Sequence, residues 1–121
     1  WGTWEEINRI NDVNDSFAEN FGWPAFEGPD RQGGYDGANL PLIESYYATV
    51  AANPSAHSTP FYAYRHNATV APGDVTGSSS PTGVAFYERG GYPSAYDGAL
   101  FFADYSRSRA YVMYQGPDGQ I

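Results

Sequence analysis

The segment ALFFADYSRSRAYVMYQ, Ala99–Gln115, carries the strongest local signal in the chain. Two apolar runs, 99–104 and 109–114, flank the short polar sequence DYSRSR. Two such runs separated by a short polar connection are typical of an antiparallel β-hairpin. Successive side chains of a strand point to opposite faces, so we expect two faces in the first strand, Leu100 with Phe102 and Phe101 with Ala103.

A third strand is predicted just upstream of this hairpin, over 82–88 in TGVAFYER. The connection GGYPSAYDG is rich in Gly and Pro and predicts a turn. Three short, evenly spaced strands joined by tight turns are typical of one blade of a β-propeller. Eleven Tyr, seven Phe and three Trp among 14 Gly and nine Pro also favour strands. The sequence therefore predicts a mainly β fold.

The upstream half predicts three further features. TWEEINRI, 3–10, is interpreted as a strand, although its apolar spacing also fits a helix. A helix is predicted over 39–53, because Leu40, Ile43, Tyr47 and Val50 recur at spacings of three and four, with Asn39 as N-cap. We expect Glu44 and Thr49 on its solvent face. The resulting division is a strand and an irregular loop over 1–38, a short helix over 39–53 and blade strands over 60–121.

The charge balance excludes several functions. Fourteen acidic residues face six basic ones, all Arg, which gives a net charge of −8. Phosphate binding needs a basic patch, so nucleic acid is not an expected partner. The lack of Lys excludes Schiff-base chemistry, and the lack of Cys excludes disulfides and thiol catalysis. No apolar run of about 18 residues occurs, so the sequence predicts no membrane span.

Several motifs, in order along the chain, resemble the family of soluble quinoprotein glucose and sorbosone dehydrogenases. EINRI at 6–10 and NFGWP at 20–24 are similar to that family's E-I-N-x-I and N-[YF]-G-W-P blocks. YRH at 64–66, YPSAYDG at 92–98 and ADY at 103–105 are similar to its Y-x-H, Y-P-x-x-x-x-G and [GA]-D-Y blocks. The similarity spans nearly the whole chain, and the NFGWP block together with the YPSAYDG and ADY blocks is its most specific part.

The resemblance implies a six-bladed β-propeller that binds pyrroloquinoline quinone (PQQ) and calcium at the mouth of its channel. Such enzymes oxidise a sugar or polyol hydroxyl, with a His base taking the alcohol proton and hydride passing to the quinone. They are exported, so we expect an extracellular or periplasmic location. The chain would hold about one to two blades with a short helical insertion. We therefore expect an internal fragment that needs the remaining blades of its parent and binds no cofactor alone.

The resemblance also implies where site residues lie. The family's main catalytic His and its calcium-binding carbonyls precede the EINRI block, so no catalytic or metal-binding residue is assigned in this chain. The family's basic contact to the quinone, usually Lys, lies in the turn after D-Y. Ser106 and Arg107 occupy that turn here and are the predicted cofactor contacts, with Arg107 able to clamp a carboxylate through two hydrogen bonds. A solvated hairpin turn is the alternative for Arg107 and Arg109.

Tyr64 and His66 are the predicted substrate contacts, because they end an aromatic strand beside a long loop. The alternative for His66 is a His with satisfied hydrogen bonds and no ligand. His57 is expected at the loop surface. Asp104 is expected either to orient the basic turn or to cap the hairpin.

A second function stays open. A propeller without catalysis would bind carbohydrate or a protein partner through aromatic loops, of which ENFGWPAFEG is an example. Within that loop, Trp23 is interpreted as a wedge between blades, and Gly33–Gly37 as a candidate for the channel mouth. NDVNDS, 11–16, resembles half of a calcium loop, but the Gly and distal Glu of an EF-hand are missing, so a solvated turn is expected.

Overall fold

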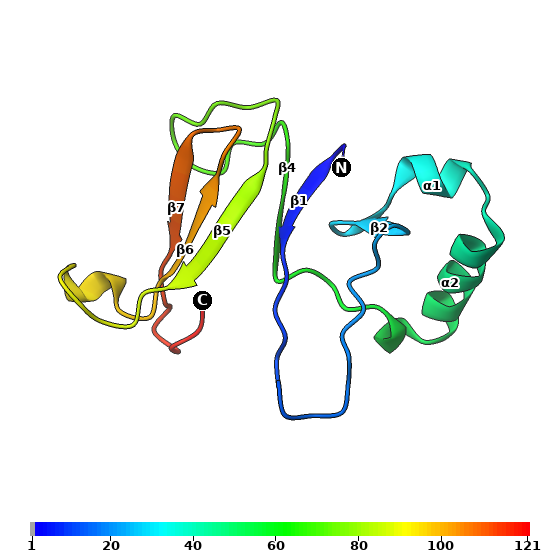
Figure 1. Cartoon of the computed structure of the whole chain (residues 1–121), viewed down its shortest axis with the longest axis horizontal. Helices are drawn as coiled ribbons and strands as arrows, with labels where there is room; N and C mark the ends of the chain where they lie inside the picture. Colours follow the sequence, from blue (N-terminus) through cyan, green and yellow to red (C-terminus); the bar gives the residue numbers. More distant parts are fainter. Residues whose placement is uncertain (1) are drawn as a thin grey trace. The chain divides into compact units, whose positions relative to one another are not determined.

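The computed structural model describes residues 2–121, and these form two compact units that divide between Arg65 and His66. Both units consist of short antiparallel strands with few helices (Figure 1). The predicted mainly β character with a short helix is confirmed at this level. Each unit is described by itself.

The second unit is built on a three-stranded sheet. Its strands are β5 (Pro81–Phe86), β6 (Leu100–Asp104) and β7 (Arg109–Met113), in the order β5-β6-β7 and antiparallel throughout. The predicted hairpin is confirmed, with Leu100 opposite Met113 and Asp104 opposite Arg109. The predicted faces are confirmed as well, because burial alternates along β6 with the even-numbered residues inside.

The connection from β5 to β6 folds back over the odd-numbered face of β6. It contains a single 3-10 turn, η2 (Ser94–Tyr96). Rings from the connection pack around Phe101, with centroid distances of 6.3 Å to Tyr87, 6.3 Å to Tyr92 and 5.8 Å to Tyr96. This small aromatic cluster is half-open to solvent, since Tyr92 is 62% exposed.

The first unit contains two smaller sheets. β1 (Trp4–Ile7) pairs antiparallel with β4 (Tyr62–Arg65), so the strand predicted over 3–10 forms only in its first half. β4, a strand within the predicted range 60–121, pairs with β1, whereas the three strands predicted as one blade form the β5-β6-β7 sheet. Trp4 lies opposite Arg65 in the register, and the Arg65 guanidinium lies 4.6 Å from the Trp4 ring.

The Gly-rich segment predicted as irregular is partly regular. It forms a minimal hairpin of β2 (Phe26–Glu27) and β3 (Asp30–Arg31), followed by a one-turn helix α1 (Gly33–Gly37). The hairpin turn needs Gly28, which has a φ of 59° and lies against the Trp4 ring. The Gln32 side chain accepts a hydrogen bond from the Tyr35 N–H and so caps α1.

The predicted helix is α2 (Pro41–Ala52), followed by the 3-10 turn η1 (Pro54–Ala56). Its bounds agree with the prediction within two residues, and Glu44 and Thr49 are exposed as expected. The predicted N-cap is wrong. Asn39 has a φ of 51°, Leu40 takes the N-cap position, and no side chain caps the helix.

Phe26 is the centre of the first unit's aromatic packing. Tyr47 of α2 packs edge-on against it at 5.4 Å, and the Tyr47 hydroxyl donates to the Ala25 carbonyl at 2.8 Å. His57 stacks on Phe26 at 4.2 Å, and its Nδ1 lies 3.3 Å from the Tyr46 hydroxyl oxygen. The expectation of His57 at the loop surface is therefore wrong, and its burial lowers the pKa of the imidazole.

Candidate functional site

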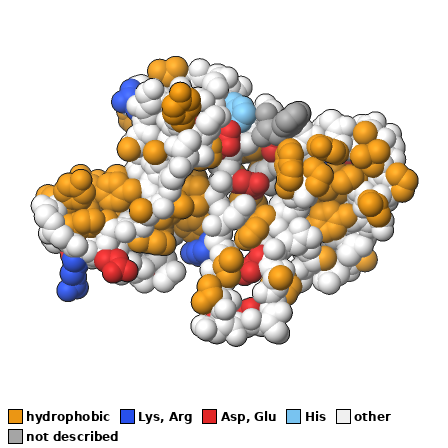
Figure 2. Space-filling model, viewed as in Figure 1, with side chains coloured by type: hydrophobic (Ala, Val, Ile, Leu, Met, Phe, Trp, Pro, Cys, Tyr) orange, Lys and Arg blue, Asp and Glu red, His pale blue; other side chains and the backbone are white. Residues whose placement is uncertain are grey.

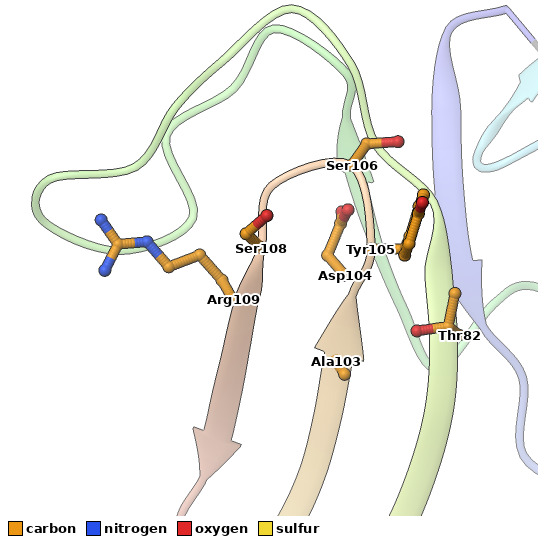
Figure 3. Close-up of a pocket in the computed structure, with 7 residues that line it drawn as sticks. All are labelled: Thr82, Ala103, Asp104, Tyr105, Ser106, Ser108 and Arg109. Atoms are coloured by element: carbon orange, nitrogen blue, oxygen red, sulfur yellow. The ribbon is translucent and has the colours of Figure 1, made fainter.

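The turn between β6 and β7 forms one side of an open pocket of about 600 Å³ (Figure 3). Hydroxyl groups dominate its wall, because it is lined by Thr82, Ala103, Asp104, Tyr105, Ser106, Ser108 and Arg109. The Ser106 hydroxyl lies 2.9 Å from that of Ser80. Ser106, a predicted cofactor contact, is thus exposed in a polar pocket.

Arg107 points away from solvent, unlike the other residues of its turn. Its guanidinium is fully buried, so the solvated-turn alternative for Arg107 is wrong. Nε donates to Ser79 Oγ at 2.8 Å, Nη1 to the Ala68 carbonyl at 2.9 Å, and Nη2 to the His66 carbonyl at 3.1 Å. The donors that a quinone carboxylate would need are therefore engaged with the segment that precedes β5. A cofactor contact at Arg107 stays a prediction.

Two buried carboxylates flank the Arg107 guanidinium. Asp74 Oδ2 lies 3.1 Å from Nη1, and Asp104 Oδ2 lies 3.5 Å from Nε. Asp104 Oδ1 also accepts the N–H groups of Ser80 and Arg107. Asp104 therefore both orients the basic turn and caps the hairpin, as the two sequence-based alternatives proposed.

Asp74 is the second anchor of this cluster. It accepts hydrogen bonds from the Val70 and Ala71 N–H groups and from the Tyr111 hydroxyl. Burial raises the pKa of Asp74, but these donors and the Arg107 guanidinium outweigh burial and hold that pKa below its usual value. Asp74 is therefore ionised at neutral pH and pairs with Arg107.

The two predicted substrate contacts fall in different units. His66 begins the second unit, is half-buried, and its carbonyl accepts from both Arg107 and the Gly77 N–H. Tyr64 lies in the first unit, is 4% exposed and packs beside Tyr62 at 5.8 Å. Tyr64 is therefore a core residue of its own unit. His66 lies in the loop that Arg107 organises.

Arg109 is the cation among the lining residues of the pocket. Its side chain is exposed, and its Nη2 donates to the Gly73 carbonyl at 2.7 Å. Figure 3 shows the side chain reaching past the turn, away from Tyr105 and Thr82. Arg109 keeps guanidinium donors toward solvent, which Arg107 does not.

The pocket fits part of the cofactor that the resemblance implies. One exposed Arg and several hydroxyls can hold one carboxylate of a quinone, and the quinone's other two carboxylates would need cations from elsewhere. Within residues 2–121, no cluster of three or more His, Asp and Glu side chains is placed to hold a metal ion.

Sequence reasoning missed the residues that bury Arg107. Asp74 and Ser79 stand in VAPGDVTGSSSP, interpreted only as a turn-rich loop. The available signal was that Asp74 is the one acidic residue among Gly, Ser and Pro in this loop. Its pairing with Arg107, 33 positions away, is set by tertiary folding. Trp23 was assigned as a wedge; it is 52% exposed and contacts Tyr35 edge-on at 6.0 Å.

Comparisons with known proteins found no match: no family model, no curated protein and no solved structure matches the chain. None of the described helices is both long and apolar enough to span a bilayer.

Proposed function

We propose that this chain is a segment of a PQQ-dependent sugar or polyol dehydrogenase with a β-propeller fold. The observation that carries the proposal is where the ordered motifs fall. The ADY block ends β6 and leads into the pocket-lining turn, YPSAYDG forms the connection before β6, and YRH ends β4. Motifs at strand ends and turns suit a function carried by loops on a scaffold.

Within this proposal, the three-stranded β5-β6-β7 sheet is one propeller blade. Its short strands and tight β6–β7 turn suit that architecture. The bound quinone would supply the hydride acceptor. This chain would supply binding groups for one carboxylate, with Ser106 donating a hydroxyl hydrogen bond and Arg109 supplying charge. We place the charged contact at Arg109 rather than Arg107 because Arg107 would have to leave Asp74, Ser79 and two carbonyls.

The test uses the full-length parent protein, loaded with PQQ and calcium and supplied with a panel of sugars and polyols. Substrate-dependent reduction of a dye is the expected result. Replacing Arg109 or Ser106 with Ala should weaken quinone binding about tenfold to a hundredfold, the range for losing a hydrogen bond to a charged group. The exposed Arg89→Ala is the matched control. If the parent protein is saturated with quinone and oxidises no sugar or polyol, the proposed dehydrogenase function is rejected.

Carbohydrate or protein-partner binding without catalysis is the second candidate, and exposed aromatic side chains favour its carbohydrate form. Tyr92 and Tyr114 are 62% and 54% exposed and flank Tyr96 in the cluster around Phe101. Figure 2 shows hydrophobic side chains at the surface of the molecule. The test is binding of the chain to an insoluble glucan. Binding that is lost in Tyr92→Ala would support carbohydrate binding, provided that the parent protein reduces no dye.

A further inference from the structure

The loop that joins β4 to β5 has its main anchor inside the β6–β7 turn. Residues 66–80 contain no helix or strand, so their shape depends on other contacts. Figure 1 shows this loop, in green, beside the end of the β6–β7 hairpin. Arg107 supplies four of these contacts, to Ser79, Ala68, Asp74 and His66.

The acceptors around Arg107 suit a guanidinium and do not suit an ammonium. Ser79 Oγ, the Ala68 and His66 carbonyls and Asp74 Oδ2 are reached from three different nitrogens at 2.8–3.1 Å. A planar guanidinium can donate to acceptors spread in this way, whereas a Lys has a single ammonium group on a shorter side chain. The charge is matched by Asp74 and Asp104, so the fork is held in one orientation.

We propose that Arg107 is a positioning residue: it folds the 66–80 loop around its guanidinium, fixes the backbone of His66, and acts on the substrate through His66. The part of this inference that concerns substrate rests on the proposed function. The His66 carbonyl receives two donors, Arg107 Nη2 at 3.1 Å and the Gly77 N–H at 2.8 Å, so losing Arg107 removes half of that support.

The chain allows a clean test by NMR. It has two His, one in each unit, and a single Met, Met113, on β7. The ring cross-peak of His66 reports on the loop, that of His57 on the other unit, and the Met113 methyl on the sheet. Hydrogen exchange of the Gly77 amide reports on the bond to the His66 carbonyl.

We expect Arg107→Lys and Arg107→Ala to move the His66 cross-peak and to speed Gly77 exchange at least about tenfold, the effect of losing a charge-assisted hydrogen bond. His57 and Met113 should not move in Arg107→Lys, and Arg89→Ala should move nothing. Unchanged His66 and Gly77 signals in both Arg107 variants would overturn the inference. So would loss of the Met113 signal in Arg107→Lys, because Arg107 would then be needed for the whole unit.

A titration with glucose and with glycerol separates this inference from the proposed function. A ligand-dependent shift of His66 that shrinks in Arg107→Lys supports both. A shift of equal size in the wild type and in Arg107→Lys overturns the positioning role and leaves the proposed function standing. If neither polyol moves the His66 cross-peak of the wild type, but the substitution Arg107→Lys itself moves it, the loop-ordering role stands and substrate contact at His66 is rejected.

Discussion

The two units of the chain differ in the groups that lie at their centres. In the first, rings surround Phe26, with His57 at 4.2 Å and Tyr47 at 5.4 Å. In the second, the Arg107 guanidinium is buried between Asp74 and Asp104. Ring contacts are many and individually weak, whereas a buried charge is costly as soon as one partner is lost. A single deletion should therefore harm the second unit more.

The sequence provides a separate probe for each unit. Every Trp lies at or before position 23, so fluorescence reports on the first unit, and Met113 reports on the second. Four substitutions test the comparison with these probes.

The largest effect is expected for Asp104→Ala. The change leaves Arg107 with half of its charge compensation and removes the acceptor of two backbone N–H groups. Breaking a buried ion pair from one side costs about 3–5 kcal/mol of unfolding free energy. Urea titration followed by the Met113 methyl measures it, with Trp fluorescence unchanged. Asp104→Asn, which keeps the shape, is the control, and equal shifts of both probes would contradict the comparison.

Phe26→Ala should destabilise the first unit by about 3 kcal/mol, the lower end for an aromatic deletion, because the ring is only half-buried. Three ring contacts are lost at once, those with Tyr46, Tyr47 and His57. The Trp fluorescence midpoint in urea should fall while the Met113 signal keeps its own midpoint. Phe26→Leu should recover part of the loss, and a Phe26→Ala loss larger than that of Asp104→Ala would reverse the ranking.

Gly22→Ala should cost about 1–3 kcal/mol, the range for strained backbone. Gly22 has a φ of 88°, and a Cβ there would lie 2.7 Å from the His57 ring. The measurement is again Trp fluorescence in urea. Gly37→Ala is the matched control, because a Cβ at Gly37 meets no atom within 4 Å. A stable Gly22→Ala would show that the His57 stack can move at little cost.

The last of the four effects is expected for Glu27→Gln, whose difference in stability from the wild type should shrink as the pH falls. Burial raises the pKa of Glu27, but the N–H groups of Thr3, Gly2 and Trp4 outweigh it and lower the pKa from 4.5 to about 2. A lowered pKa means that the ionised form stabilises the fold, so this stability is present above pH 4.5 and is lost as the pH falls toward 2.

Trp fluorescence against pH measures this loss, and Glu27→Gln should flatten the curve over that window. The exposed Glu44→Gln should leave the acid transition unchanged. An identical acid transition in Glu27→Gln and the wild type would assign the acid sensitivity to other groups.

Short-range patterns were predicted well, and contacts between distant residues were not. The hairpin 99–114 and the helix 41–52 follow from spacing within a dozen residues. The strand 62–65 was also predicted, but its partner β1 lies more than 50 positions away, so local spacing could not identify the pairing. The β2–β3 hairpin was missed because two-residue strands carry no detectable alternation.

The candidate site shows the same limit. Ser106 and Arg107 were predicted as cofactor contacts from their place in the turn, but no local pattern tells which Arg faces solvent. The structure buries Arg107 against Asp74 and leaves Arg109 exposed at the pocket. His57 was placed at the surface because its neighbours are Ser and Pro, yet it stacks on Phe26, 31 positions earlier.

The sequence by itself determined the strand and helix periods and the polar turn at 104–109. Only the tertiary structure decided which side chains meet. Periodicity is a property of neighbouring residues. By contrast, the partners of Arg107 lie 28 to 41 positions away, the ring that stacks on His57 lies 31 positions away, and the N–H groups that bind Glu27 lie 23 to 25 positions away. Burial and charge pairing depend on those segments, and no local pattern encodes them.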